Sequence, residues 1–554
     1  MDKISTNKRN HFWVFSSILA LLSLFMIFVY QPLCPGQDYF FHARRLQALI
    51  DGLFDNPFMI YLDYAAVDGY GYFTKAFYPD LLLIPFALIG YFTGFTFAYQ
   101  LLIFTFTFLC GIFTYKAVNY IYNNPYAAAI SALLYTFCIY RLLDIYNRAA
   151  IGEAMSFTFV PIVFLGLYHI IKGDYRKWYI IAIGFSLMIF THLISSVLMF
   201  ITVLIFCAIY WKSLFRDPKR IYYLLLAGGI TIILTAYYIF PMLEQMLSNT
   251  FYYESRDIMS KTEDATDGLH WIIWGMFTGI VHPYQVFIPG IGIFLTLAIA
   301  LRLFVNEKTK ELRSVDIGVI VGLVYIFAVS NFFPWSVYPF KLLNFIQIPW
   351  RLYEFSSFLF AVAGGYYISR ILITNKRRLL NAVILVIGLT VMMLSDSQFY
   401  HEIRSNRPIT QQADITNDYH LGGLEYFPEK LPSIQFVHQR GNVIIPTDEK
   451  ALISNIERER GKTSFDLVSS GNNTSLELPL TYYKGYKATL NNKEIPVSES
   501  KNGLIQVSSS GSGKIDVYYG GTTTQKGSWF ITLISIAALC VYIIFIRRKE
   551  EKET

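Results

Sequence analysis

The feature that most constrains this chain is a series of long apolar runs between Phe12 and Ile546, separated by short charged loops. Each run has about 18 residues or more, enough for a helix to cross ~30 Å of hydrocarbon. Only 15% of the 554 residues are charged, whereas a soluble globular protein carries about a quarter. We therefore expect an all-α polytopic membrane protein rather than several soluble domains.

The rest of the composition excludes other classes. The formal charge of +7 comes from lysine and arginine in loops, and no segment combines a basic stripe with a nucleic-acid module. The five cysteines form no CxxC pair and no Cys/His metal spacing. Neither a nucleic-acid partner nor a disulfide framework is predicted.

The distribution of lysine and arginine predicts the orientation, because loops rich in these residues stay in the cytoplasm. Basic residues precede the first run and follow the last, so both termini should be cytoplasmic and the number of crossings even. The apolar stretch Leu81–Tyr91 is short and contains Pro85, and we expect it not to cross. About 12 spans are then predicted, near residues 12–30, 95–120, 126–141, 155–171, 178–194, 195–211, 221–241, 286–305, 315–333, 352–373, 379–395 and 528–546.

These spans divide the chain into three predicted regions. Residues 1–395 form a transmembrane domain with a long first outer loop at 31–94. Residues 396–527 alternate apolar and polar side chains between Gly, Asn and Ser turns, as in NNTSLELPL and YKATLNNKEIPV, which indicates antiparallel strands. We expect a small extracytoplasmic β-sandwich-like domain there, followed by a final span and a basic cytoplasmic tail at 528–554.

The first group of chemically interesting residues directly follows the first span, in PGQDYFFHARRL. If a helix begins near Asp38, then Asp38, His42 and Arg45 fall at positions i, i+4 and i+7 on one face. Such a helix would present a carboxylate, an imidazole and a guanidinium at the outer membrane surface. The alternative is that Asp38 only caps the helix by accepting backbone N–H bonds.

A second group lies in the predicted outer loop at 142–154. Arg141, Asp144 and Arg148 are charged residues between two apolar spans, and they could form a solvated rim. Glu153 begins the next span, where a carboxylate is costly unless it is paired. Arg148 is its expected partner.

Two further residues stand at the outer ends of spans. His192, in FTHL, is a candidate substrate ligand, although a lone histidine is more often a hydrogen-bonded core residue. Arg351, in IPWRLYEF, offers a planar donor fork that suits phosphate oxygens. Its alternative role is a structural pair with Glu354.

The predicted site gathers a carboxylate, an imidazole and arginines at the outer mouth of an apolar bundle. This combination suits a substrate that joins a lipid to a phosphate. The lipid would lie between spans and the phosphate would meet Arg351. An acidic residue could act as base on an acceptor hydroxyl, while cations stabilise the leaving phosphate.

Several segments resemble a known group. A first outer loop that opens with an Asp, a second outer loop with acidic and basic residues, and a late outer Arg resemble the GT-C superfamily of polyprenol-phosphate-sugar-dependent glycosyltransferases. PGQDYFFHARR, NRAAIGEAMSFTFVPI, FTHL and IPWRLYEF are similar to bacterial YfhO-type proteins and to those called "6-pyruvoyl-tetrahydropterin synthase-related domain" membrane proteins. The resemblance covers about residues 1–395, and LTYYKGYKATLNNKEIPV also resembles the β-rich end of the YfhO-like group.

The resemblance implies a glycosyltransferase of the bacterial plasma membrane, with a polyprenyl-phosphate-linked sugar as donor and a cell-envelope polymer or glycolipid as acceptor. It implies Asp38 as the catalytic carboxylate, Glu153 as its partner in substrate or metal binding, and Arg351 as the phosphate ligand. His42, Arg45, Asp144, Arg148 and His192 are placed as substrate ligands by their own pattern. The second outer loop lacks a DxD pair, which leaves a divalent metal at Asp38 and Glu153 open.

Two other functions remain open from the sequence. A transporter or flippase for lipid-linked glycans would carry charges along a path through the bundle. A non-catalytic scaffold that binds envelope glycan would not bring Asp38 and Glu153 together. The sequence favours the enzyme, because charged residues inside the spans are sparse.

Overall fold

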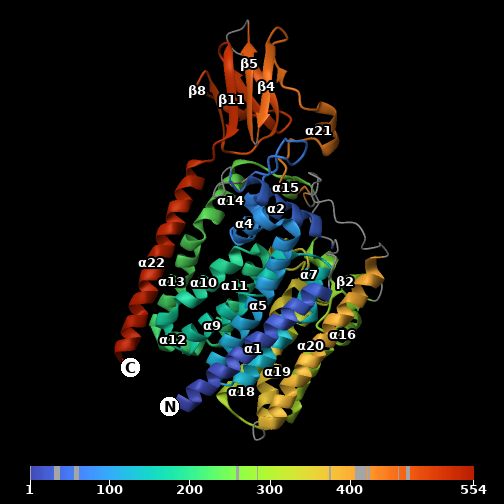
Figure 1. Ribbon diagram of the computed structural model, residues 1–554, viewed down its shortest axis with the longest axis vertical. Coiled ribbons are helices and arrows are strands. Elements are labelled where there is room, and N and C mark those ends of the chain that lie inside the picture. The colour runs from blue at the N-terminus through green and yellow to red at the C-terminus, as the bar shows by residue number, and fades with distance from the viewer. Residues whose placement is uncertain are drawn as a thin grey trace. The chain divides into compact units, whose positions relative to one another are not determined.

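The structure is a computed structural model that describes residues 2–29, 36, 38–54, 62–256, 261–282, 285–372, 376–405, 421, 424–459, 461–469 and 474–553. It is mostly helical, with a separate β-rich region near the C-terminus (Figure 1). Two compact units form. The first contains Met1–His42, Thr96–Thr231 and Ser260–Ala413, and the second Ala43–Phe95, Ile232–Met259 and Asp414–Thr554.

The first unit is a helical bundle around α19, which packs against α6, α17 and α18, while α1, α6 and α20 contact one another. A short 3-10 helix, Pro349–Leu352, leads into α19. The helices wholly or mainly in this unit are α1 (Asp2–Val29), α5 (Phe95–Tyr122), α6 (Pro125–Thr136), α7 (Ile139–Tyr146), α8 (Ile151–Ser156), α9 (Val160–Ile171), α10 (Tyr179–Ile189), α11 (Leu193–Ile209), α12 (Trp211–Arg216), α13 (Pro218–Leu234), α16 (Leu269–Thr278), α17 (Ile293–Ala300), α18 (Lys310–Ala328), α19 (Tyr353–Ile371) and α20 (Lys376–Ser405).

Several helices are long and apolar enough to span a membrane, which agrees with the predicted class. Within the described ranges five qualify: Asn10–Phe28, Phe95–Tyr122, Pro125–Tyr146, Lys376–Leu394 and Thr523–Arg548. The pair Pro218–Leu234 and Ala236–Ser248, bent by 72°, makes a sixth if it counts as one span. The predicted number of 12 is therefore not confirmed.

The difference arises because many predicted spans are shorter or interrupted as helices. The run at 155–171 divides into α8 and α9, and the runs at 178–194 and 195–211 become α10 of 11 residues and α11 of 17 residues. At 1.5 Å per residue α10 covers only about 16 Å. The stretch expected not to cross forms α4 (Ile84–Thr93), which is likewise too short to cross alone.

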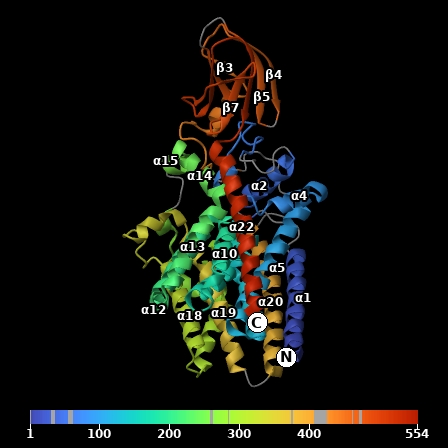
Figure 2. The same ribbon diagram turned by 90° about the vertical axis from the view of Figure 1, so that its left-hand side faces the viewer.

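The second unit combines helices with nine strands of the C-terminal region. Figure 2 shows α22 along α14, and the two helices pack against each other. The helices are α2 (Tyr39–Gly52), α3 (Thr74–Phe77), α4, α14 (Ala236–Ser248), α15 (Tyr252–Ser255), α21 (Ile434–Arg440) and α22 (Thr523–Glu553). The strands are β3 (Ile445–Pro446), β4 (Leu452–Glu459), β5 (Lys462–Val468), β6 (Thr474–Thr481), β7 (Tyr486–Leu490), β8 (Lys493–Ile495), β9 (Val497–Glu499), β10 (Leu504–Ser509) and β11 (Gly513–Tyr519).

The strands confirm the predicted β-rich region. They form two antiparallel sheets, in the orders β3-β6-β10-β9 and β4-β5-β11-β7-β8. Both sheets contribute to one apolar core, with Leu476 and Val507 from the first and Phe465 and Val517 from the second. The alternating pattern of the sequence identified these strands because one face of each sheet is buried.

Candidate active site

The segment at Gly36 and Asp38 lies directly against the loop between α7 and α8. The backbone N–H of Asp38 donates to the carbonyl of Arg148 at 2.7 Å. A Cβ at Gly36 would come within 2.7 to 2.8 Å of backbone atoms of Asn147, Arg148 and Ala149. Only glycine allows this approach, which fixes Asp38 beside Arg148.

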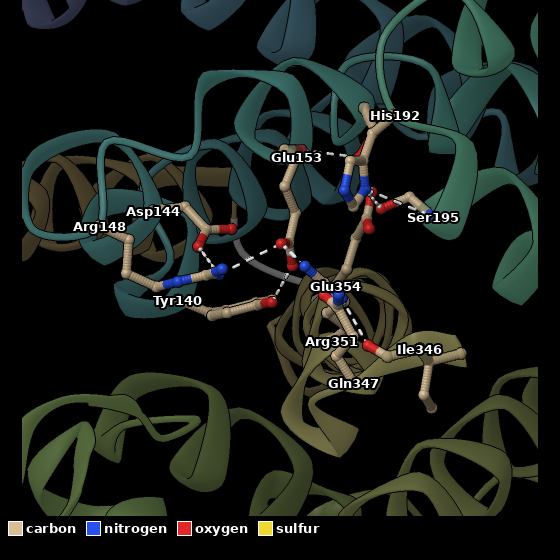
Figure 3. Close-up of polar contacts among 11 residues, drawn as sticks. Tyr140, Asp144, Arg148, Glu153, His192, Ser195, Ile346, Gln347, Arg351 and Glu354 are labelled. Atoms are coloured by element: carbon tan, nitrogen blue, oxygen red, sulfur yellow. Dashed lines mark hydrogen bonds and ion pairs between the residues drawn. The ribbon is translucent and has the colours of Figure 1, made fainter. Parts of the chain in front are cut away.

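Glu153, in α8, is the centre of a buried ion-pair cluster (Figure 3). Its Oε2 accepts from Arg148 Nη1 at 3.2 Å and from Arg351 Nε at 3.2 Å, and its Oε1 accepts from the hydroxyl of Tyr140. Burial by itself would raise the pKa of Glu153, but the positive charges of Arg148 and Arg351 hold it at about 2. The carboxylate is therefore charged at neutral pH and firmly bound.

Arg148 joins Glu153 to a second carboxylate. Its Nη1 also donates to Asp144 Oδ1 at 2.6 Å, across one turn at the end of α7. The side chain of Asp144 is 0% exposed, so the solvated rim is not what forms here. Because Nη1 makes both bonds, Nε and Nη2 of Arg148 have no hydrogen-bond partner in the described part of the chain.

Arg351 is held from two sides. Besides Glu153, it contacts Gln347, whose Oε1 accepts from Nη1 at 3.2 Å, and the carbonyl of Ile346. Its ion pair is with Glu153 and not with Glu354, the partner expected for a purely structural role. Within the described residues its Nη2 makes no hydrogen bond, which leaves one edge of the guanidinium for a ligand.

On the other side of Glu153 lie His192, Ser195 and Glu354 (Figure 3). His192 caps α11, with Nδ1 accepting from the N–H of Ser195 at 3.3 Å and lying 2.9 Å from its hydroxyl. Glu354 is buried, and its Oε1 accepts from the hydroxyl of Ser156 at 2.6 Å. His192 is thus a hydrogen-bonded residue in the wall of the cluster, as its alternative interpretation expected.

His42 approaches the same place from α2. A Cβ at Gly152, next to Glu153, would lie 3.8 Å from His42 Cε1 and 3.9 Å from His192 Cδ2. Both imidazoles therefore border the short stretch of α8 that carries Glu153. The closest approach to a Cβ at Gly152 would be the backbone carbonyl of Thr191, at 3.0 Å.

Asp38 differs from Asp144, Glu153 and Glu354 because the residue is partly exposed. Among the described residues no group donates a hydrogen bond to its carboxylate, so it does not act as the cap of α2. Burial raises the pKa of Asp38, Arg148 and Arg351 partly offset the rise, and Glu153 adds to it. Asp38 thus lies within electrostatic reach of all three cluster residues, and its carboxylate accepts no hydrogen bond from the described residues.

Arg45 and Arg141 have partners outside the cluster around Glu153. Arg45, expected on the face of Asp38 and His42, belongs to the second unit, where it pairs with Asp80 and donates to the carbonyl of Pro79 at 3.0 Å. Arg141 is 1% exposed and donates to Thr136 O at 3.0 Å and Thr107 Oγ1 at 3.2 Å. Arg141 is therefore a buried structural residue rather than part of a rim.

The sequence did not single out Tyr140, Ser156 or Ser195 as members of the cluster. Tyrosine and serine are common inside apolar helices, and no spacing marked these positions. One signal was present: Tyr140 and Asp144 are four residues apart and so share a face of α7.

No metal site emerges from these residues. Within the described ranges, no group of three or more His, Cys, Asp or Glu side chains is arranged to hold a metal ion. Both oxygens of Glu153 are taken by Tyr140, Arg148 and Arg351. The arrangement instead offers a partly exposed carboxylate beside two oriented guanidinium groups.

Comparison with known proteins assigns the chain to no family. No family model matches the chain. It is similar to an uncharacterized protein of Lactococcus lactis subsp. cremoris (strain MG1363), with 22% identity over 578 aligned residues, 94% of this chain and 93% of that protein. This coverage extends through both the helical and the β-rich parts. The resemblance to the GT-C superfamily stays a prediction.

Proposed function

We propose that the chain is an integral membrane glycosyltransferase that moves a sugar from a polyprenyl-phosphate-linked donor to an extracytoplasmic acceptor of the cell envelope. The observation that carries this proposal is the position of Asp38, whose backbone N–H donates to the carbonyl of Arg148 and whose carboxylate lies within electrostatic reach of the two arginines held by Glu153. These residues come from segments predicted at the outer ends of different spans.

The chemistry follows from the two kinds of group. Asp38 accepts the proton of the acceptor hydroxyl as its oxygen attacks the anomeric carbon. The bond between that carbon and the phosphate oxygen breaks, and the lipid phosphate leaves with the electron pair. The unused N–H groups of Arg148 and Arg351 stabilise the charge that develops on the phosphate.

Glu153 has a different task in this scheme. With its pKa at about 2 it is a poor base, and three side chains already donate to it. We assign it as a positioning residue that fixes the two guanidinium groups. An arginine held by a carboxylate loses little freedom when a phosphate binds.

The proposal is tested with protein reconstituted in liposomes that contain polyprenyl-linked sugars extracted from the producing bacterium. Asp38→Asn should lower kcat by at least about 100-fold with donor binding retained, since general-base catalysis contributes about 10²–10⁴-fold. Arg351→Lys should raise KM for the donor and also lower kcat, because lysine lacks the fork that binds the phosphate and stabilises its developing charge. In wild type and in Asp38→Glu, the transfer rate should rise with pH as the carboxylate at position 38 ionises.

The matched controls come from an ion pair elsewhere in the bundle. Arg302 donates to both oxygens of Asp316 at 2.8 and 2.9 Å in a more exposed ion pair, so Asp316→Asn and Arg302→Lys make the same kinds of substitution away from the cluster. Both controls should keep wild-type transfer. Full activity of Asp38→Asn would remove Asp38 from the chemistry, and lipid movement without transfer would favour the flippase.

A further inference from the structure

The second unit contains a cavity of about 390 Å³ that the proposed catalytic cluster does not use. It lies between the segment after α2 and the sandwich, and three tyrosines, Tyr64, Tyr70 and Tyr486, line it together with Asn442 and Arg458. Its volume is within the range of pockets for small organic ligands. The combination of aromatic rings with fixed polar groups is that of a binding site rather than of a packing defect.

Glycines keep this cavity open. Gly69, Gly71 and Gly461 line it with φ values of 81°, 87° and 82°, a region that other residues rarely adopt. A Cβ at Gly71 would lie 3.5 Å from the side chain of Leu62 and 3.8 Å from the hydroxyl of Tyr486. The backbone conformation and the open space therefore depend on the same residues.

The hydroxyl of Tyr486 is the least explained polar atom in the lining. Tyr486 is 8% exposed, and its hydroxyl has no hydrogen-bond partner among the described residues. Its ring is fixed by an edge contact with Tyr519 at 5.3 Å. A buried hydroxyl without a hydrogen-bond partner lowers the stability of the fold unless a ligand supplies the missing bond.

The charges around the cavity balance. Arg458 is held by Gly69 O at 2.7 Å and Pro479 O at 3.1 Å, and Lys462 pairs with Asp516 at 3.2 Å. Asp516 lies outside the lining and neutralises Lys462, so Arg458 and Glu459 remain in the lining as one cation and one carboxylate. This balance favours a neutral polar ligand over an inorganic or lipid phosphate.

We infer that this cavity binds a saccharide, with one or two sugar rings between the tyrosines and a sugar hydroxyl hydrogen-bonded to Tyr486. Tyrosine faces suit the C–H side of a sugar ring, and amide and guanidinium groups supply fixed donors for its hydroxyls. Identification of this saccharide as part of the acceptor rests on the proposed function. The binding itself does not.

The test is saturation-transfer NMR on the full chain in lipid nanodiscs, free of glycoside detergent. The probes are the methyl glycosides of glucose, galactose, mannose, rhamnose and N-acetylglucosamine, with inorganic phosphate as a separate arm. We expect at least one glycoside to bind wild type, and Tyr486→Phe to weaken it about tenfold, the value of a buried hydrogen bond. Tyr518→Phe, on β11 and outside the lining, should bind as wild type.

The Tyr486→Phe variant separates the inference from a folding effect, because it deletes a hydroxyl that has no hydrogen-bond partner among the described residues and should leave the melting temperature unchanged or raised. Absence of glycoside binding, equal binding by Tyr486→Phe, or binding of phosphate alone would overturn the saccharide site. Asp38→Asn should bind the glycoside normally. A failure of the proposed transfer reaction would therefore leave this result interpretable by itself.

Discussion

At the scale of single residues, two carboxylates that share the same arginines have opposite surroundings. Glu153 accepts from three side chains, and the arginines hold its pKa at about 2. Asp38 is partly exposed, its carboxylate accepts no hydrogen bond from the described residues, and its pKa is raised. The first is suited to hold positive groups in place and the second to take up a proton.

The ion pairs of Glu153 predict a pH dependence of stability. Because its pKa falls from 4.5 to about 2 on folding, its contribution is complete above pH 4.5 and is lost as pH falls towards 2. That contribution is on the order of 3 kcal/mol. The difference in unfolding free energy between wild type and Glu153→Gln should therefore shrink over this window, and a difference independent of pH would contradict the assignment.

At the scale of elements, the polar side chains of the cluster lie at breaks between helices. Glu153 lies before the break between α8 and α9, His192 at the start of α11, and Arg351 in the 3-10 helix before α19. Backbone groups freed at such breaks need partners inside a membrane protein, which is why breaks occur where polar groups gather.

The approach of Gly36 to the loop between α7 and α8 gives a prediction at this scale. Gly36→Ala would force its Cβ against three backbone atoms, displacing Asp38 and lowering kcat with little change in expression. Gly388→Ala in α20, where a Cβ meets nothing within 4 Å, is the matched control and should behave as wild type. Transfer assays on both variants decide it, and an unaffected Gly36→Ala would contradict this placement of Asp38.

The sequence predicted those elements whose signal is local. Apolar and polar side chains alternate along the strands because each sheet buries one face. The turn between β7 and β8 was indicated by Asn491 and Asn492, which both have positive φ. The pairing of Glu153 with Arg148 was expected from the sequence, whereas the ion pair between Glu153 and Arg351 was not. The pairing of Arg45 with Asp80 was not predicted, because Asp80 lies 35 residues away and no sequence spacing links the two.

The number of spans could not be read from apolar content either. Hydropathy measures how apolar a run is, whereas α10 and α11 are separated by a break at Phe190–His192 that makes each short. A break inside an apolar run has no compositional mark unless proline or glycine causes it.

At the scale of the whole molecule, the proposed reaction requires Asp38 and the β-rich region to face the exterior. In a chain whose cysteines are replaced by serine, a cysteine at exposed Lys501 should react with an impermeant maleimide in intact cells. A cysteine at Lys376, at the predicted cytoplasmic end of α20, should react only after lysis. The reverse pattern would place the cluster on the wrong side for an extracytoplasmic acceptor.

The most direct test of the central claim is the sugar composition of envelope glycans in a deletion strain complemented with wild type, Asp38→Asn or Asp316→Asn at equal expression. We predict that wild type and Asp316→Asn restore a sugar that the deletion strain lacks, and that Asp38→Asn does not. Full restoration by Asp38→Asn, or identical glycans with and without the gene, would contradict the account.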